Sequence, residues 1–109
     1  MLRAGQLNRL VSIEQVSETK GVSGDLQRAW VELAKVWSEK VDLSGRELEA
    51  AKSIHAEISV RFRIRYRADI KAGMRIVLAG ELFSVLAPLD KTGRRTELHL
   101  MCSVGLISG

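Results

Sequence analysis

The stretch ISVRFRIRYR, residues 58–67, alternates apolar and polar side chains without a break. A period of two places alternate side chains on opposite faces of a β-strand. One face then carries the apolar side chains that form the core: Ile58, Val60, Phe62, Ile64 and Tyr66. The other face carries four guanidinium groups: Arg61, Arg63, Arg65 and Arg67. The stretch therefore predicts a half-buried strand with a strongly basic outer face.

A β-hairpin is expected after this strand. Residues 76–78 and 82–86 are rich in apolar side chains, and Ala79-Gly80-Glu81 between them predicts a tight turn. Pro88 is expected to end the second strand of the hairpin, because proline cannot donate a hydrogen bond to a central ladder.

The C-terminal part predicts one more strand. Asp90-Lys91-Thr92-Gly93 is a turn sequence, with glycine at the position that needs a positive φ. Residues 96–106 then alternate, and the side chains expected to point inward are Leu98, Leu100, Cys102, Val104 and Leu106.

Two strands are expected before residue 43. The first covers residues 9–16, with Val11 and Ile13 on one face. A glycine-containing loop follows at residues 17–25, and it lacks the Lys-Ser/Thr pair of a phosphate-binding loop. The second strand covers residues 28–42, and its alternation changes phase between Leu33 and Ala34, which predicts a β-bulge.

A short helix is expected next. Ser44-Gly45-Arg46-Glu47 has the spacing of a capping box, in which Ser44 accepts from the amide of Glu47, and Leu43 and Leu48 stand at the positions of a hydrophobic staple. The helix should end by Ile54 or His55. Its apolar stripe is thin, consisting of Leu48, Ala51 and Ile54. So short a helix needs a docking surface, either in its own fold or on a neighbour.

These elements define the fold class. We expect a mainly β protein, a small six-stranded antiparallel barrel or sandwich with one short α-helix inserted between strands 2 and 3. Closure of the sheet protects its edges. At 109 residues, a single domain over residues 1–109 is expected, large enough to hold a core without metal or disulfide staples.

Composition excludes several classes of protein. The single cysteine excludes an intramolecular disulfide and indicates a reducing compartment. The apolar runs are far shorter than the ~20 residues that span a bilayer. The first ten residues contain no apolar signal region, so we expect a soluble protein made inside the cell, with no membrane partner.

Catalytic and metal sites are not expected. His99 and Cys102 are three residues apart on a predicted strand, so they point to opposite faces and cannot share a metal ion. His99 is assigned to the outer face, His55 to a helix end, and Cys102 to the core. No nucleophile elbow is present. We therefore expect a protein that is not an enzyme and uses no cofactor. Trp30 lies at the start of the second strand and Trp37 on its apolar face, which favours core or subunit contact over a ligand box for both.

The net charge of +4 is concentrated in one stretch. Residues 57–75 contain six cations and two anions, whereas the rest of the chain carries eleven of each sign. Three interpretations of the arginine strand remain open. In the first, its outer face is solvated and paired with carboxylates among Glu14, Glu32, Glu39 and Glu97. In the second, the arginines form a subunit interface. In the third, they contact a nucleic-acid backbone.

Read together, the motifs resemble the phage head–tail joining family, the head-closure or head–tail adaptor proteins of tailed bacteriophages and prophages. The residues that carry the resemblance run through nearly the whole chain: Gly5-x-Leu7-x-Arg9-Leu10, Ala29-Trp30-Val31-x-Leu33-Ala34-x-Val36-Trp37, Ser44-Gly45-Arg46-Glu47, Ile64-Arg65-Tyr66-Arg67-x-Asp69-Ile70, Gly73-Met74-Arg75-Ile76, Gly80-x-x-Phe83-Ser84-Val85 and Gly93-Arg94-Arg95-x-x-Leu98-x-Leu100-x-Cys102. The order and spacing of these pieces make the match specific.

The resemblance implies a structural part of the virion. Members of the family look like small β-barrels that assemble as a ring on the portal-side connector, dock the tail and help to close the DNA channel. The implied partners are further copies of the chain, the portal-side connector protein and a tail-completion protein, with DNA in the channel as a further candidate. The implied location is the virion head–tail junction, after synthesis in the bacterial cytoplasm. Rings need unlike surfaces on the two sides of each protomer.

The inserted segment is the candidate contact element. By similarity, residues 43–58 project toward the ring lumen or the adjoining subunit. The residues of interest are Ser44, Gly45, Arg46, Glu47, Lys52 and His55. We expect residues 44–55 to be a switchable element, mobile in the isolated protomer. The alternative functions are a small nucleic-acid-binding barrel that uses the basic stretch of residues 61–75, and a phage-encoded regulatory or interaction module.

Overall fold

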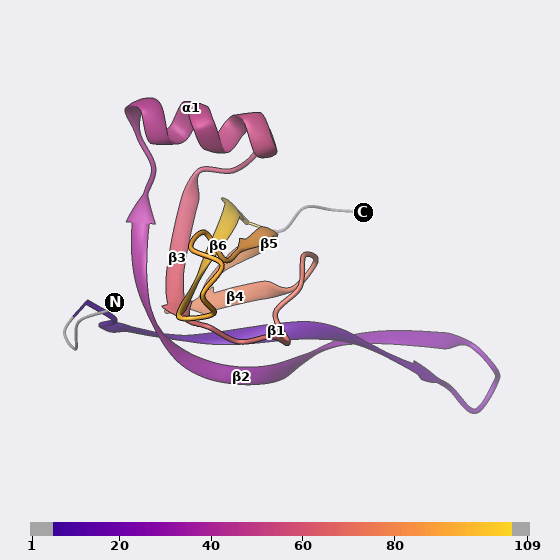
Figure 1. Cartoon of the computed structure of the whole chain (residues 1–109). Helices are drawn as coiled ribbons and strands as arrows, with labels where there is room; N and C mark the ends of the chain where they lie inside the picture. The colour runs from indigo at the N-terminus through magenta and orange to yellow at the C-terminus, as the bar shows by residue number, and fades with distance from the viewer. Residues whose placement is uncertain (1–5, 106–109) are drawn as a thin grey trace.

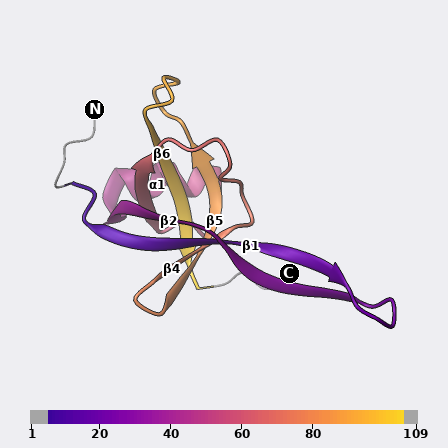
Figure 2. The ribbon, with the colours of Figure 1, turned by 90° about the horizontal axis from the view of Figure 1, so that it is seen from below.

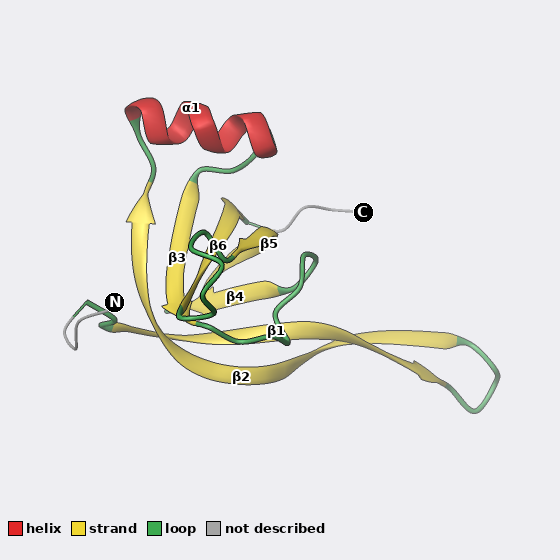
Figure 3. Cartoon of the chain, in the orientation of Figure 1, coloured by secondary structure: helices red, strands yellow, loops and turns green. Residues whose placement is uncertain are grey.

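The computed structural model describes residues 6–105 as a closed barrel of antiparallel strands with one helix outside it (Figures 1 and 3). The elements are β1 (Arg9–Lys20), β2 (Leu26–Asp42), α1 (Gly45–Ile54), β3 (Val60–Arg65), β4 (Arg75–Leu78), β5 (Glu81–Leu89) and β6 (Glu97–Val104). Around the barrel the strand order is β1-β2-β3-β6-β5-β4. The predicted fold class is confirmed, with a barrel rather than a sandwich and the helix between strands 2 and 3.

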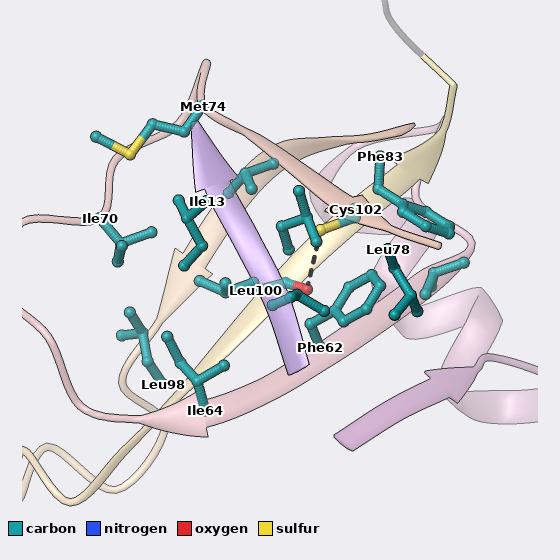
Figure 4. Packing of buried hydrophobic residues seen from close by; sticks show 14 residues of the cluster. Ile13, Phe62, Ile64, Ile70, Met74, Leu78, Phe83, Leu98, Leu100 and Cys102 are labelled. Carbon is teal, nitrogen blue, oxygen red and sulfur yellow. Dashed lines mark hydrogen bonds between the residues drawn. The ribbon is translucent and has the colours of Figure 1, made fainter. Parts of the chain in front are cut away.

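The barrel interior is filled by the inward side chains of all its strands. Figure 4 shows Phe62 and Phe83 packed edge to face, with ring centroids 5.0 Å apart. Cys102 lies in this core and donates a hydrogen bond from Sγ to the carbonyl of Leu100, 3.3 Å away. The alternation of residues 58–64 is confirmed, since Ile58, Val60, Phe62 and Ile64 are all buried. Tyr66 is only half-buried and lies beyond the end of β3.

The hairpin of β4 and β5 turns at Ala79 and Gly80, which have φ angles of 49° and 84°. Positive φ at both turn residues is the geometry that suits the twist of a two-residue hairpin. The prediction that Pro88 ends the strand is wrong, because β5 continues to Leu89 and Pro88 is opposite Leu100 of β6. Past a register shift between Val85 and Ala87, β5 is paired with β6 alone. Its other edge is open there, so a residue without an N–H is tolerated.

β6 is buried on both faces over most of its length. Leu98, Leu100 and Cys102 point into the barrel as predicted, while Met101 packs outside against α1. Val104 was predicted to point inward, and this is wrong: it is 66% exposed, because the pairing of β6 with β5 ends at Ser103. The predicted inward position of Leu106 lies outside the described residues.

β1 and β2 extend well past the barrel as a two-stranded ribbon. We name residues 16–30 the arm; its strands pair from Val16 opposite Trp30 to Lys20 opposite Leu26. Figures 1 and 2 show the arm projecting away from the barrel, and the molecule measures 50 × 29 × 28 Å. The sequence placed the end of the first strand at residue 16 and a loop at residues 17–25. The structure corrects this, because the ribbon continues and the loop is confined to residues 21–25.

The predicted bulge in the second strand is confirmed. Ile13 is opposite Ala34 and Glu14 is opposite Glu32, so Leu33 is the extra residue of β2. Bulges increase the local twist and bend of a strand. The bulge lies where the shared ribbon leaves the barrel, near the three residues of β1 that pair with β4.

α1 lies on the outer surface of the barrel. Its buried residue Ala51, with Leu48, packs against Leu43, Ile58 and Met101 in a small second core. The predicted capping box does not form: Ser44 makes no side-chain cap hydrogen bond. Gly45 has a φ of 56°, outside the right-handed helical region, so the backbone at the helix start does not aim Ser44 at the amide of Glu47.

Candidate functional site

The arginines of β3 are held mainly by carboxylates of the same molecule. Nη2 of Arg63 is 3.2 Å from Glu39 and Nε is 4.0 Å from Glu97, and the same Nη2 donates a hydrogen bond to Gln6, 3.1 Å away. All three charged side chains are largely shielded from water. Glu39 and Glu97 were two of the four predicted carboxylate partners, so Arg63 joins β2, β3 and β6 on the outer wall.

Two further arginines of the basic stretch contact acids elsewhere. Nη1 of Arg61 is 3.8 Å from Glu47 of α1, so this pair links the helix to the barrel. Arg67 donates two hydrogen bonds to Asp69, of 3.0 and 2.8 Å. These hydrogen bonds raise the pKa of Arg67 and lower the pKa of Asp69, although both side chains remain partly exposed.

Arg65 differs from its neighbours on the strand. It is exposed, and no carboxylate partner is found for it in the described part of the chain. Of the six cations in residues 57–75, only Arg65 and Lys71 lack an ion pair within residues 6–105. A nucleic acid that used this stretch would have to displace the other four from their carboxylates.

Arg65 borders a hollow on the barrel wall, which we name the wall groove. Its volume is about 320 Å³, and its lining residues are Leu7, Val36, Trp37, Arg65, Tyr66 and Arg67. Trp37 is 55% exposed, so of the two interpretations left open by the sequence, core or subunit contact, the core is excluded. The remaining interpretation, subunit contact, is a prediction that suits a large aromatic side chain left on the surface beside a groove.

The base of the arm is fixed by Arg75 of β4. Its Nε donates a hydrogen bond of 2.6 Å to Glu14 of β1, and its guanidinium carbon lies 4.3 Å from the ring centroid of Trp30. Trp30 is thus half-buried at the arm base rather than in the barrel core. Farther out, Arg28 and Glu18 form an exposed ion pair of 2.9 Å across the ribbon.

The arm could not be predicted from the sequence because its strands have no buried face. Residues 17–29 other than Gly21 and Ser17 are all exposed, so their sequence carries no hydrophobic alternation. An isolated two-stranded ribbon is marginally stable in water. The one available signal was the pair Gly21 and Gly24 with Asp25, which is typical of a tight hairpin end.

The inserted segment presents all six of its candidate residues to solvent. Ser44, Gly45, Arg46, Glu47, Lys52 and His55 are all exposed. Within α1, Ala51 and Leu48 pack in the small second core, whereas Ile54, which is predicted to belong to the apolar stripe, is 52% exposed. A shallow crevice of about 140 Å³ remains between the helix and the wall, lined by residues that include Glu47, Ala50 and Arg61. The helix is therefore docked along a narrow line, with its outer face available.

The titratable residues examined for catalysis are separated as expected. Cys102 is in the barrel core, where burial raises the pKa of its thiol. His99 is on the opposite face of β6 but is buried there, with Nε2 3.0 Å from Glu97. Residues 6–105 hold no group of three or more His, Cys, Asp or Glu side chains arranged for a metal ion. Nor does that part of the chain contain a helix with the length and hydropathy of a membrane-spanning segment.

Comparison with known proteins gives a consistent result. The family model of the phage head completion protein matches residues 2–105. The head completion protein gp7 of Enterobacteria phage HK97 is 24% identical over 109 residues, covering 95% of this chain and 97% of that protein.

Two solved structures share the fold. The solution structure of protein SF1141 from Shigella flexneri 2a has a TM-score of 0.78 and 28% identity, covering 98% of this chain and all of that one. A chain from the virion of a native gene transfer agent particle has a TM-score of 0.58 and 17% identity, covering 96% of this chain and all of that one.

The match to the family model covers almost the whole chain and agrees with the resemblance carried by the sequence motifs. The closed barrel with its inserted helix is the fold that the resemblance implied. The chain therefore belongs to the family of phage head completion proteins, which are structural proteins of the virion with a role in joining head and tail rather than enzymes.

Proposed function

We propose that this chain assembles as a ring at the portal vertex, joins the DNA-filled head to the tail and helps to close the DNA channel. Residues 1–109 act as a single head–tail adaptor domain in this proposal. The observation that carries it is the match of residues 2–105 to the head completion family. The partners are further copies of the chain, the portal-side connector protein on the head side and a tail-completion protein on the other, after synthesis in the bacterial cytoplasm.

The distribution of elements supports a role in assembly. The barrel closes on itself and needs no partner to complete its core. Two elements lie outside it: the arm, whose residues beyond the base belong to neither hydrophobic cluster of residues 6–105, and α1, which docks by a narrow line. These elements differ in shape and chemistry. Unlike surfaces on one protomer are what a ring requires, because its contacts are heterologous.

The inserted segment is the proposed contact with the channel or the adjoining subunit. The exposed residues of α1 and its flanks that are outside the small second core are Ser44, Gly45, Arg46, Lys52 and His55. Glu47 is also exposed, but it lies on the side of the helix that faces Arg61 of the barrel wall. The pair of Arg61 and Glu47 is partly exposed and 3.8 Å long, so it holds the helix weakly. A helix held in this way can rearrange when a neighbour binds, which is the switch that we propose for residues 44–55.

Electron microscopy of the purified chain mixed with portal–connector complexes tests the proposal. We expect an added ring-shaped layer on the connector, which grows with the concentration of the chain because many weak contacts act together. Connectors that remain bare at saturating concentrations would contradict it.

A further inference from the structure

The arm ends in a compact turn that holds an apolar side chain in water. The amide of Gly21 donates to the carbonyl of Asp25 over 2.7 Å, and the amide of Gly24 donates to Gly21 over 2.9 Å. Ser23 donates a hydrogen bond to the carboxylate of Asp25, 2.9 Å away. Val22 is fully exposed on this turn. We name residues 21–25 the tip; it presents one apolar side chain and one carboxylate.

A single exposed apolar residue is ordinary on a protein surface. This one is at the end of an element that the protein holds away from its barrel (Figures 1 and 2). The molecule is about 21 Å longer than it is wide, and the arm runs along the long direction (Figure 1). The contacts of Arg75 with Glu14 and Trp30 set the direction of the arm at its base. The tip is therefore placed to reach a second molecule.

The wall groove has the complementary chemistry. Leu7, Val36 and Trp37 supply apolar lining, and Arg65 supplies a guanidinium that no carboxylate of the described residues neutralises. The second cation, Arg67, is already held by Asp69. The groove thus has room for an apolar side chain and for one carboxylate beside Arg65. The tip carries both, in Val22 and Asp25.

We propose that the tip of one copy occupies the wall groove of the next, with Val22 against Val36 and Trp37 and the carboxylate of Asp25 on Arg65. This inference rests on the proposed ring and names the surfaces that meet in it. Tip and groove are different patches, so the contact is heterologous and propagates from copy to copy until the rotation closes a ring. Burial of one valine and one exposed ion pair is a weak contact, which becomes firm only through ring closure.

Cross-linking tests the contact directly. A chain with Val22→Cys and Val36→Cys is treated with a short bis-maleimide reagent, both purified and in particles assembled in the host cell. The native Cys102 stays silent because it is buried. We expect a ladder of covalent oligomers. The matched control, Val104→Cys with Val36→Cys, places the first thiol at another exposed valine, at the end of β6, and should give single chains only.

Charge reversal gives a second, independent readout. Asp25→Arg or Arg65→Asp alone should weaken self-assembly by about tenfold or more, while the double variant Asp25→Arg with Arg65→Asp should recover most of it. A 1:1 mixture of Val22→Asp and Trp37→Ala chains should stop at pairs, because only one tip and one groove in each pair remain intact.

The two proposals fail differently. Rings on the connector without the tip–groove ladder, or single charge variants that assemble like the unaltered chain, would overturn the inference and leave the proposed function standing. A ladder in the purified chain, with bare connectors and particles that keep their tails without this chain, would support the contact and overturn the ring at the portal vertex.

Discussion

Arg63 and Arg65 are two residues apart on one face of β3, yet their environments differ. Arg63 is shielded and contacts Glu39, Glu97 and Gln6, whereas Arg65 is exposed beside the wall groove. An arginine that pairs with half-buried carboxylates stabilises the fold, because removing it here leaves Glu39 without its ion-pair partner. An exposed and unpaired arginine contributes little to stability and is free to bind.

We therefore expect Arg63→Ala to lower the free energy of unfolding by about 1–3 kcal/mol and Arg65→Ala to change it by less than about 0.5 kcal/mol. Urea unfolding followed by circular dichroism measures both. Equal losses in the two variants would show that the shielding of Arg63 has no energetic consequence.

Cys102 gives the protein a dependence of stability on alkaline pH. Burial raises the pKa of its thiol in the folded state, while in the unfolded chain the thiol titrates near about 8.5. Below that pH both states keep the proton. Above it the unfolded state loses a proton that the folded state retains, so stability falls as pH rises, by up to about 1.4 kcal/mol per pH unit.

Urea unfolding of the unaltered chain and of Cys102→Ala between pH 8 and pH 10 isolates this effect. The variant starts less stable because it leaves a cavity, but its stability should fall less steeply with pH. If the free energies of unfolding of the two proteins fall equally steeply with pH, the raised pKa of the Cys102 thiol is contradicted.

At the scale of the elements, the arm depends on its base. Beside the backbone pairing of β1 with β4, the side chain of Arg75 ties the ribbon to β4 through its contacts with Glu14 and Trp30. Arg75→Ala should lower the free energy of local opening in the arm by about 1–3 kcal/mol, with faster amide hydrogen exchange there and little change in β3 and β6.

The matched control for the arm is Arg28→Ala, which breaks only the exposed pair with Glu18. This substitution should lower the free energy of local opening in the arm by at most about 0.5 kcal/mol. Arm exchange that is equally fast in both variants would mean that the base does not hold the ribbon.

The docking of α1 rests on one of two adjacent alanines. Ala51 is buried against the barrel and Ala50 is exposed. Both Ala→Asp substitutions lower helix propensity equally, so a difference beyond the roughly 0.5 kcal/mol of each local i,i+4 charge pair reports burial. Ala51→Asp should release the helix and cost about 1–3 kcal/mol more than Ala50→Asp, as measured by unfolding and by hydrogen exchange in α1. Two variants of equal stability would contradict the observed docking.

The sequence predicted those elements that bury one face. The alternation of residues 58–64, the phase change in β2 and the Ala79-Gly80 turn follow from burial or from backbone sterics, and the structure confirms all three. The arm could not be predicted, because neither of its faces is buried. The exposure of Trp37 was equally hidden, since the same aromatic side chain suits a core and an interface.

As a whole molecule, the protein combines a self-sufficient barrel with two elements that extend beyond it. The barrel packs its own core and pairs most of the charged side chains on its wall. The surfaces that remain available for binding are the arm, the wall groove and the outer face of α1. These surfaces are the ones that we propose to meet in a ring. In the proposed ring the interface of a single pair is small, and closure of the ring supplies the strength.

The most direct test of this account is electron microscopy of particles from a host in which the gene for this chain has been deleted from an otherwise complete phage. We expect DNA-filled or leaking heads and separate tails, with joining restored when the unaltered chain is supplied and not when Val22→Asp is. Tailed, infectious virions formed at the normal level without the chain would contradict the account.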